Sequence, residues 1–382
     1  MRLRETCAPI TTTSSSNGLN TQDYELQQHP RIQQAGQRTS TMSQSLPKTF
    51  KAAVLTKAGG PLEIKDVPML EVQEGEVLIK VHACGVCHSD SNVMNGDMGP
   101  PQIERLGHEF VGTVVSVPPS EKKWKIGDRV GGPWHGGHDH NCRACGRGLF
   151  QMCSNKAING VTRNGGYGQY ATLRTEAAVR VPKDVEPAEV APLLCAGVTV
   201  FNGIRNMGIM AGDIVAVQGL GGLGHLAIQY ARKMGYRTVA LSRGTEKKDF
   251  AMKLGANDYI DIKANDVGEE LQKLGGAACI VVTAPNPDVI SPLLNGLGPQ
   301  GKLLVHTAIG PVPVNTVPMV LNALSVCGWP SGHAQDSEDV IAFAQTHGVK
   351  CMIEKFPLEK AQEAMEHMLA GKPRFRAVLT MD

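Results

Sequence analysis

A cysteine and a histidine about twenty residues apart are the first candidates for chemistry. Cys87 lies in the segment Cys84-Gly85-Val86-Cys87-His88-Ser89-Asp90, and His108 follows in Gly107-His108-Glu109. Because this separation is too long for neighbours on one helix, the two side chains meet only if the fold brings two loops together, as zinc sites require. Ser89 would then place a hydroxyl beside the open metal position, and Asp90 would accept the other ring N–H of His108. A redox pair or half of a structural zinc knot, built on Cys84 and Cys87, is the alternative.

A second group of cysteines occupies His138-Asp139-His140-Asn141-Cys142-Arg143-Ala144-Cys145 and closes at Cys153. Cys142 and Cys145 are separated by two residues, a spacing too regular for scattered core thiols. Counting back from Cys142 over two more residues reaches Asp139. Three thiolates and one carboxylate carry the formal charge of four thiolates, so the sequence predicts a closed structural zinc site. His138 or His140 as the fourth ligand is one alternative, and a lobe of free cysteines without metal is the other.

Cys195 stands in the apolar segment Ala191-Pro192-Leu193-Leu194-Cys195-Ala196-Gly197, where we expect a helix to begin. By itself it would be a buried hydrophobic residue. Its importance lies in the number of ligands, because the first site has Cys87 and His108 and still lacks a third protein ligand.

A glycine-rich turn follows the apolar strand that we expect over 214–218. The turn reads Gly219-Leu220-Gly221-Gly222-Leu223-Gly224 and leads into a segment with the apolar period of a helix. In this strand, turn and helix context, a dinucleotide pyrophosphate can approach bare backbone at a helix N-terminus. Strands and helices alternate from there, which predicts a doubly wound parallel sheet. Further strands are expected at 237–242, 258–262, 277–284 and 301–309, with a helix at 267–274 and others ending at 255 and 297.

The end of the second of these strands carries the prediction of cofactor preference. An enzyme for NAD(H) would place an Asp or Glu there, whereas this chain has Ser242, Arg243 and, further on, Lys247. A guanidinium and a hydroxyl suit a 2′-phosphate, so we expect NADP(H) to be preferred over NAD(H). Alternatively, Arg243 stacks on the adenine and both cofactors bind.

Size and composition bound the remaining possibilities. The 382 residues are enough for two domains, and the 42% of hydrophobic and 19% of charged residues are ordinary for a globular enzyme. A net charge of +2 gives no reason to expect nucleic acid or an anionic membrane as a partner. The chain has no apolar run of membrane-spanning length and no signal core, and its ten cysteines are expected to stay reduced or metal-bound in the cytoplasm.

Four segments divide the chain. Residues 1–47 are polar and are expected to be disordered, with translation from Met42 or a targeting role as the alternatives. A mostly β catalytic domain is expected at 48–185, the dinucleotide-binding domain at 186–345, and a segment returning to the first domain at 346–382. The expected elements outside the parallel sheet are strands at 50–56, 62–69, 76–86, 110–118, 128–132, 171–173, 179–182, 350–356 and 374–379, and helices at 337–347 and about 358–369.

These motifs together resemble the zinc-dependent alcohol dehydrogenases of the medium-chain dehydrogenase/reductase superfamily, from Lys48 to the end of the chain. The resemblance implies a GroES-like catalytic domain interrupted by a Rossmann domain. It also implies that Cys87, His108 and Cys195 hold the catalytic zinc and that Glu109 can approach it. Asp139, in place of the lobe's first cysteine, resembles a branch common in filamentous fungi.

The resemblance further implies hydride transfer between NADP(H) and a small alcohol or aldehyde, in fungi often in secondary metabolism. Ser89 would bind the substrate oxygen and pass its proton toward His88, because many relatives have a histidine where this chain has Asn92. Otherwise protons leave through water and the cofactor ribose. Trp134 would narrow the pocket toward primary alcohols and aldehydes, unless it is ordinary packing. A homodimer or homotetramer is expected.

Two other functions compete with this one. A zinc-free quinone or enoyl reductase of the same fold would need none of the three zinc ligands, and all three are present. An NADP(H)-binding sensor without turnover would be expected to lack a ligand or the Ser89 hydroxyl, and it lacks neither.

Overall fold

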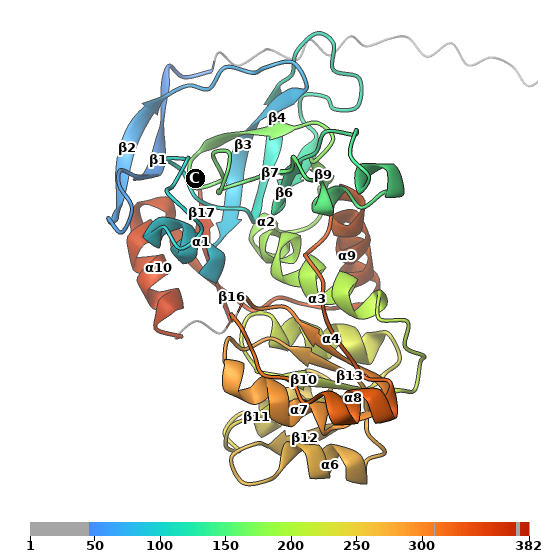
Figure 1. Ribbon diagram of the computed structural model, residues 1–382. Helices are drawn as coiled ribbons and strands as arrows, with labels where there is room; N and C mark the ends of the chain where they lie inside the picture. The colour runs from blue at the N-terminus through green and yellow to red at the C-terminus, as the bar shows by residue number, and fades with distance from the viewer. Residues whose placement is uncertain (1–45, 309, 372–374, 382) are drawn as a thin grey trace, which may run out of the picture. The chain divides into compact units, whose positions relative to one another are not determined.

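The structure, a computed structural model, describes residues 46–308, 310–371 and 375–381 (Figure 1). The disorder predicted for residues 1–47 therefore falls almost entirely outside the described residues. Two sheets organise the rest: a mixed one of seven strands and a parallel one of six. The strands of the first half of the chain are β1 (Thr49–Leu55), β2 (Leu62–Pro68), β3 (Glu76–Gly85), β4 (Phe110–Ser116), β5 (Arg129–Gly132), β6 (His135–Gly137), β7 (Ala157–Ile158), β8 (Tyr170–Arg174) and β9 (Val179–Arg180).

The seven-stranded sheet joins distant parts of the sequence. Its strand order is β16-β17-β3-β4-β5-β9, with β8 paired to β3. Strands β16 (Ile353–Pro357) and β17 (Arg376–Thr380) come from the end of the chain, and β17 pairs antiparallel with β3, where Leu379 faces Cys84. The short helix α1 (His88–Asn95) and helix α10 (Ala361–Leu369), which follows a 3-10 turn at Leu358–Lys360, contact each other although they are far apart in the sequence.

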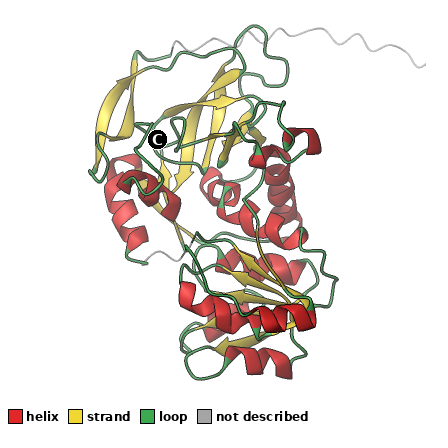
Figure 2. Cartoon of the chain, in the orientation of Figure 1, coloured by secondary structure: helices red, strands yellow, loops and turns green. Residues whose placement is uncertain are grey.

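The parallel sheet has the strand order β12-β11-β10-β13-β14-β15, which is the order of a dinucleotide-binding fold. Figure 2 shows the strands in yellow and the helices around them in red. Successive residues of a strand pack into different hydrophobic cores. Val215 and Val217 pack with α4 (Gly224–Lys233), whereas Ala216 packs with α6 (Val267–Lys273) and α7 (Ile290–Leu294). Helices therefore cover both faces. The strands are β10 (Ile214–Gln218), β11 (Arg237–Ser242), β12 (Asp258–Asp261), β13 (Ala277–Val282), β14 (Leu297–Val305) and β15 (Ser325–Gly328).

The helices of this part include two that precede the first strand of the sheet in the sequence and one that follows its last strand. They are α2 (Pro187–Val190), α3 (Ala196–Arg205), α4 (Gly224–Lys233), α5 (Lys248–Lys253), α6 (Val267–Lys273), α7 (Ile290–Leu294), α8 (Thr316–Asn322) and α9 (Ala334–His347). Single 3-10 turns lie at Ala191–Leu194 and Pro287–Val289. Within the described ranges no single helix is long and apolar enough to span a membrane, and one pair, Pro187–Leu194 with Ala196–Arg205, meets that test only together and bent by 50°.

Two expected boundaries were clearly wrong, and one helix was not expected. The strand expected at 301–309 is β14, which already pairs with Ala277 at Leu297 and carries an irregularity near Gln300, whose φ is 59°. The helix expected from residue 337 begins at Ala334, because the His333 ring accepts the Gln335 N–H and caps the helix. No helix was expected at His88–Asn95; the Asp90 carboxylate starts this helix by accepting the Cys87 N–H at 2.8 Å.

Candidate active site

Four side chains from three loops meet in one buried cluster. Cys87 immediately precedes α1, His108 and Glu109 precede β4, and Cys195 immediately precedes α3. One ligand atom from each of these residues lies within 4.8 Å of the corresponding atoms of the others, and the two sulfurs are 4.0 Å apart. The fold thus brings together the three residues expected to bind zinc and the glutamate expected beside them.

The donor set of this cluster suits zinc. His108 and Glu109 are fully buried, yet His108 Nε2 and Glu109 Oε2 have no hydrogen-bond partner among the described residues. Buried polar atoms without partners are costly, so such a cluster is expected to hold a ligand. Two thiols and an imidazole are the protein ligands of a catalytic zinc with an open fourth position.

Asp90 holds this arrangement together. Its Oδ1 lies 3.0 Å from His108 Nδ1 and accepts the Gly107 N–H at 3.2 Å. Its Oδ2 accepts the Cys87 N–H at 2.8 Å and the Tyr167 hydroxyl at 3.1 Å. The carboxylate therefore orients the histidine, leaving Nε2 as the free ring nitrogen, as a partner behind a metal ligand does.

Charges inside the cluster change the proton affinities of its members. The neighbouring Cys195 thiol lowers the pKa of Cys87 well below its usual value, helped by Arg376 and His108. Burial alone would lower the pKa of His108, but Asp90 and Cys87 outweigh it and raise that pKa well above its usual value. Burial raises the pKa of Glu109 to about 8 against the opposing charge of Arg376. A thiolate is thereby favoured at Cys87, which is the form that binds metal.

Sequence reasoning missed Arg376, the first residue of β17. Its Nη2 donates to Glu109 Oε1 at 2.5 Å and lies 3.7 Å from Cys87 Sγ. A Cβ placed on Gly222 would lie 3.3 Å from Arg376 Nη1, so the same guanidinium also borders the glycine-rich turn. The only signal in the sequence was an arginine before the apolar run of 377–379, which is expected to be buried only when paired.

The glycine-rich turn leaves its backbone uncovered. Gly219 has φ 95° and donates its N–H to Leu241 O at 3.0 Å, and a Cβ on Gly224 would lie 1.9 Å from Gly219 O. Only glycine is tolerated at these two positions. A Cβ on Gly221 would meet nothing within 4 Å, Gly222 borders only the Arg376 region, and Leu223 caps α4. Open backbone at a helix N-terminus is suited to a pyrophosphate.

The residues expected to contact the 2′-phosphate follow directly on β11. Ser242 is buried, whereas Arg243 and Lys247 are exposed. Lys247 Nζ lies 3.5 Å from Leu220 O and so reaches across to the glycine-rich turn. Arg243 has no partner for its guanidinium among the described residues. This edge therefore presents two exposed positive side chains, with the Glu246 carboxylate in the same turn.

The second cysteine group is also assembled. Ligand atoms of Asp139, Cys142, Cys145 and Cys153 all lie within 4.8 Å of one another. The backbone N–H groups of Cys145 and Ser154 lower the pKa of Cys142 to about 6, which favours a thiolate. The 3-10 turns Cys145–Arg147 and Phe150–Met152 shape this lobe. Three thiols and a carboxylate match the ligand set expected for a structural zinc.

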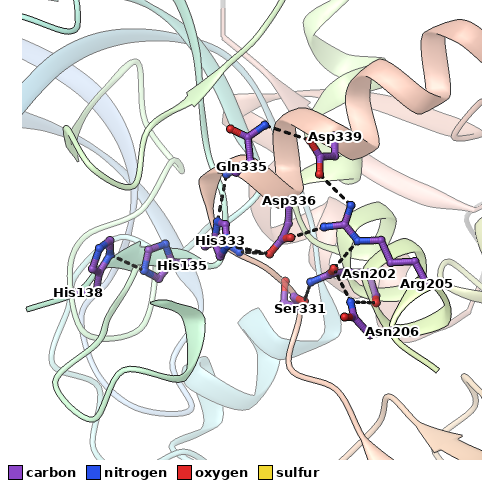
Figure 3. A network of polar contacts seen from close by, with 10 residues as sticks. All are labelled: His135, His138, Asn202, Arg205, Asn206, Ser331, His333, Gln335, Asp336 and Asp339. Atoms are coloured by element: carbon purple, nitrogen blue, oxygen red, sulfur yellow. Dashed lines mark hydrogen bonds and ion pairs between the residues drawn. The ribbon is translucent and has the colours of Figure 1, made fainter. Parts of the chain in front are cut away.

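The two histidines considered as alternative ligands point elsewhere. His138 Nδ1 lies 3.2 Å from His135 Nε2, as the pair in Figure 3 shows, and its ring stacks on Phe150. The His140 ring contacts the rings of His138 and Phe150. In the described part of the chain, neither histidine belongs to the cysteine cluster.

The remaining predicted residues surround the first cluster to different degrees. Trp134 packs edge-on against the His108 ring, with 4.8 Å between the ring centres, so it lines the cluster directly. Ser89 and His88 occupy the first turn of α1; Ser89 is half-buried and His88 is exposed. Asn92 is half-buried one turn later.

A polar network fixes the helix that follows Cys195 (Figure 3). Arg205, at the end of α3, pairs with Asp336 and with Asp339, the latter at 2.8 Å, and donates to Asn202 Oδ1 at 2.7 Å. Asn202 in turn donates to Ser331 O at 2.9 Å. These contacts tie the C-terminal turn of α3, the helix that Cys195 precedes, to α9 and to the segment before it.

Comparison with known proteins agrees with this geometry. Residues 73–183 match the alcohol dehydrogenase GroES-like domain, and residues 222–346 match the zinc-binding dehydrogenase domain. The chain is 53% identical over 344 residues to the alcohol dehydrogenase patD of Penicillium expansum, covering 89% of this chain and 100% of that one. It is 52% identical over 338 residues to the alcohol dehydrogenase notN of an Aspergillus species, covering 88% and 100%.

A solved structure shares the fold as well. The cinnamyl alcohol dehydrogenase SbCAD4 of Sorghum bicolor superposes with a TM-score of 0.78 at 28% identity, covering 87% of this chain and 98% of that chain. With both domains matched and half of the residues shared with fungal relatives, the chain belongs to the alcohol dehydrogenases of the medium-chain dehydrogenase/reductase superfamily.

Proposed function

We propose that this alcohol dehydrogenase depends on zinc and transfers hydride between NADP(H) and a small alcohol or aldehyde. The observation that carries the proposal is the position of Arg376, which contacts Glu109 and Cys87 on one side and borders Gly222 on the other. One guanidinium therefore separates a metal-binding cluster from a dinucleotide-binding turn. A substrate at the cluster and a cofactor at the turn would be close to each other, as hydride transfer requires.

In this proposal Cys87, His108 and Cys195 hold the catalytic zinc. When bound, the metal polarises the substrate oxygen, and the nicotinamide supplies or accepts the hydride. Ser89 hydrogen-bonds the substrate oxygen and passes its proton toward His88, which is exposed and can exchange it with water. Trp134, packed against His108, forms a wall that keeps the reacting carbon close to the cluster.

A second zinc is proposed in the lobe. Asp139 Oδ1 accepts the N–H groups of Asn141 at 2.9 Å and Cys142 at 3.2 Å, which orients the carboxylate toward the three sulfurs. Three thiolates and one carboxylate close the coordination sphere, so this zinc serves stability and takes no part in turnover.

The preference for NADP(H) is supported by charge. Arg243 is exposed and has no partner in the part of the chain that the structure describes, and Lys247 reaches the edge of the glycine-rich turn. A phosphate on the ribose would provide the missing counter-charge. Arg243→Asp should reverse the ratio of kcat/KM for NADPH and NADH; an unchanged ratio would place the recognition of the 2′-phosphate elsewhere.

A homo-oligomer is supported by one exposed apolar face. Val317, Val320 and Leu321 on α8 are 62%, 80% and 77% exposed. β15, at the end of the parallel sheet, has a free edge in the described structure. An apolar helix near an unpaired strand edge is an unfavourable surface in a monomer, and we propose that a second copy covers it.

The test of zinc dependence is Cys195→Ala, with Cys327→Ala as the control. Cys327 is a half-buried free cysteine on β15 and belongs to neither cluster. Cys195→Ala should lose one zinc per chain and turnover of aldehydes with NADPH, whereas Cys327→Ala should keep both. Turnover retained by Cys195→Ala without zinc would instead favour a zinc-free reductase of the same fold.

A further inference from the structure

The turn after β11 is held in place by the neighbouring strand β12. The Tyr259 hydroxyl donates to Gly244 O at 2.6 Å, and the Gly244 N–H donates to Asp261 Oδ1 at 2.8 Å. Tyr259 and Asp261 both lie on β12, which runs parallel to β11 with Ser242 opposite Asp261. Both polar groups of the Gly244 backbone are therefore bound by side chains of a single strand.

The turn adopts a conformation that needs such support. Gly244 has φ 70°, and a Cβ added to it would lie 2.2 Å from Glu246 Oε2. A glycine in this region has many other conformations open to it, so free rotation there would let Arg243 leave its place. Two hydrogen bonds restrict that freedom before any ligand binds.

Asp261 binds the backbone of this turn and the backbone just after its own strand. Its Oδ1 also accepts the Lys263 N–H at 2.9 Å, so one oxygen satisfies two backbone donors. Tyr259 thus holds the turn at Gly244, the residue that directly follows Arg243.

We propose that Tyr259 is a positioning residue for recognition of the 2′-phosphate, because it fixes the turn that presents Ser242 and Arg243. The inference rests on the NADP(H) preference proposed above and adds the residue that sets its strength. Because the turn is already ordered, binding does not have to compensate the entropy that would be lost in ordering it. The resulting gain in binding free energy should be largest for the 2′-phosphate, which the turn would contact.

The experiment compares Tyr259→Phe with Tyr236→Phe in the full chain. Tyr236 precedes β11 at the opposite end of the strand, is 8% exposed, and its hydroxyl makes no hydrogen bond within the described residues. The probes are adenosine 2′,5′-bisphosphate and 5′-AMP, with Kd measured by calorimetry. Loss of one hydrogen bond should weaken the bisphosphate about two- to tenfold in Tyr259→Phe and leave 5′-AMP within about twofold. Tyr236→Phe should match the wild type for both.

The outcomes separate this inference from the cofactor preference. If the wild type binds both probes equally, the NADP(H) preference is wrong and the inference loses its basis. If the wild type prefers the bisphosphate and Tyr259→Phe keeps the full preference, the preference stands and the inference is overturned. An equal loss for both probes in Tyr259→Phe also overturns it, because it assigns the tyrosine to general folding.

Discussion

Replacing Asp90 with asparagine should disturb the metal cluster without changing any of its ligands. Four donors share the two oxygens of this buried carboxylate: His108 Nδ1, the N–H groups of Cys87 and Gly107, and the Tyr167 hydroxyl. Asparagine offers one oxygen and one NH2 group. In either orientation of the amide, one backbone N–H, that of Gly107 or that of Cys87, faces another donor, because the Tyr167 hydroxyl and the His108 ring can also accept.

The magnitude follows from these contacts. Hydrogen bonds to a charged acceptor contribute about 1.5–3 kcal/mol each, so losing one of them should lower the free energy of unfolding by about 1.5–3 kcal/mol. The orientation of His108 is lost at the same time, and loss of such a partner typically weakens metal binding about 10- to 100-fold.

Urea unfolding and competition with a zinc chelator measure the two effects. Asp97→Asn is the matched control, because Asp97 is exposed shortly after the same helix and its carboxylate has no partner within the described residues. An Asp90→Asn protein within about 1 kcal/mol of the wild type, with equal zinc retention, would refute the role given to Asp90.

Three further predictions concern other parts of the chain. Burial lowers the pKa of His225 to about 4; the unfolded chain takes up this proton near pH 6.5, so the stabilisation present above that pH is lost as pH falls toward 4. Between pH 7 and pH 5, the free energy of unfolding should therefore fall by about 2 kcal/mol less in His225→Asn than in the wild type. Urea unfolding at both pH values measures this difference. Val320→Glu should yield monomers in sedimentation velocity, whereas Met210→Glu, at an equally exposed methionine, should not; an unchanged assembly in Val320→Glu contradicts the proposed interface. Cys153→Ser should lose one zinc per chain and lower the Tm while NADPH turnover persists, and a full zinc content would argue against the lobe site.

Local patterns predicted the elements of the parallel sheet well. The predicted ranges 214–218 and 237–242 are the observed bounds of β10 and β11. Buried parallel strands are short apolar runs between glycine-rich turns, which makes their ends visible in the sequence. The boundary of β14 was wrong because its irregular pairing with β13 depends on a neighbouring strand, which no local pattern contains.

The candidate site shows the same limit. The residues expected to bind the catalytic zinc could be recognised in the sequence, because their types and spacing are specific to that chemistry. The structure brings them together. Arg376 escaped prediction because its partner Glu109 is 267 positions away, so only the pairing of β17 with β3 brings the two together. The role of Tyr259 was likewise hidden, since its contact with Gly244 depends on which strands are neighbours.

Zinc content per chain, measured on purified protein together with aldehyde reduction by NADPH and by NADH, tests the central claim most directly. The account predicts two zinc ions per chain and turnover that is faster with NADPH. One zinc with turnover would mean that the Asp139 lobe holds no metal. Protein purified without chelator that contains no zinc and still reduces aldehydes would contradict the proposed mechanism.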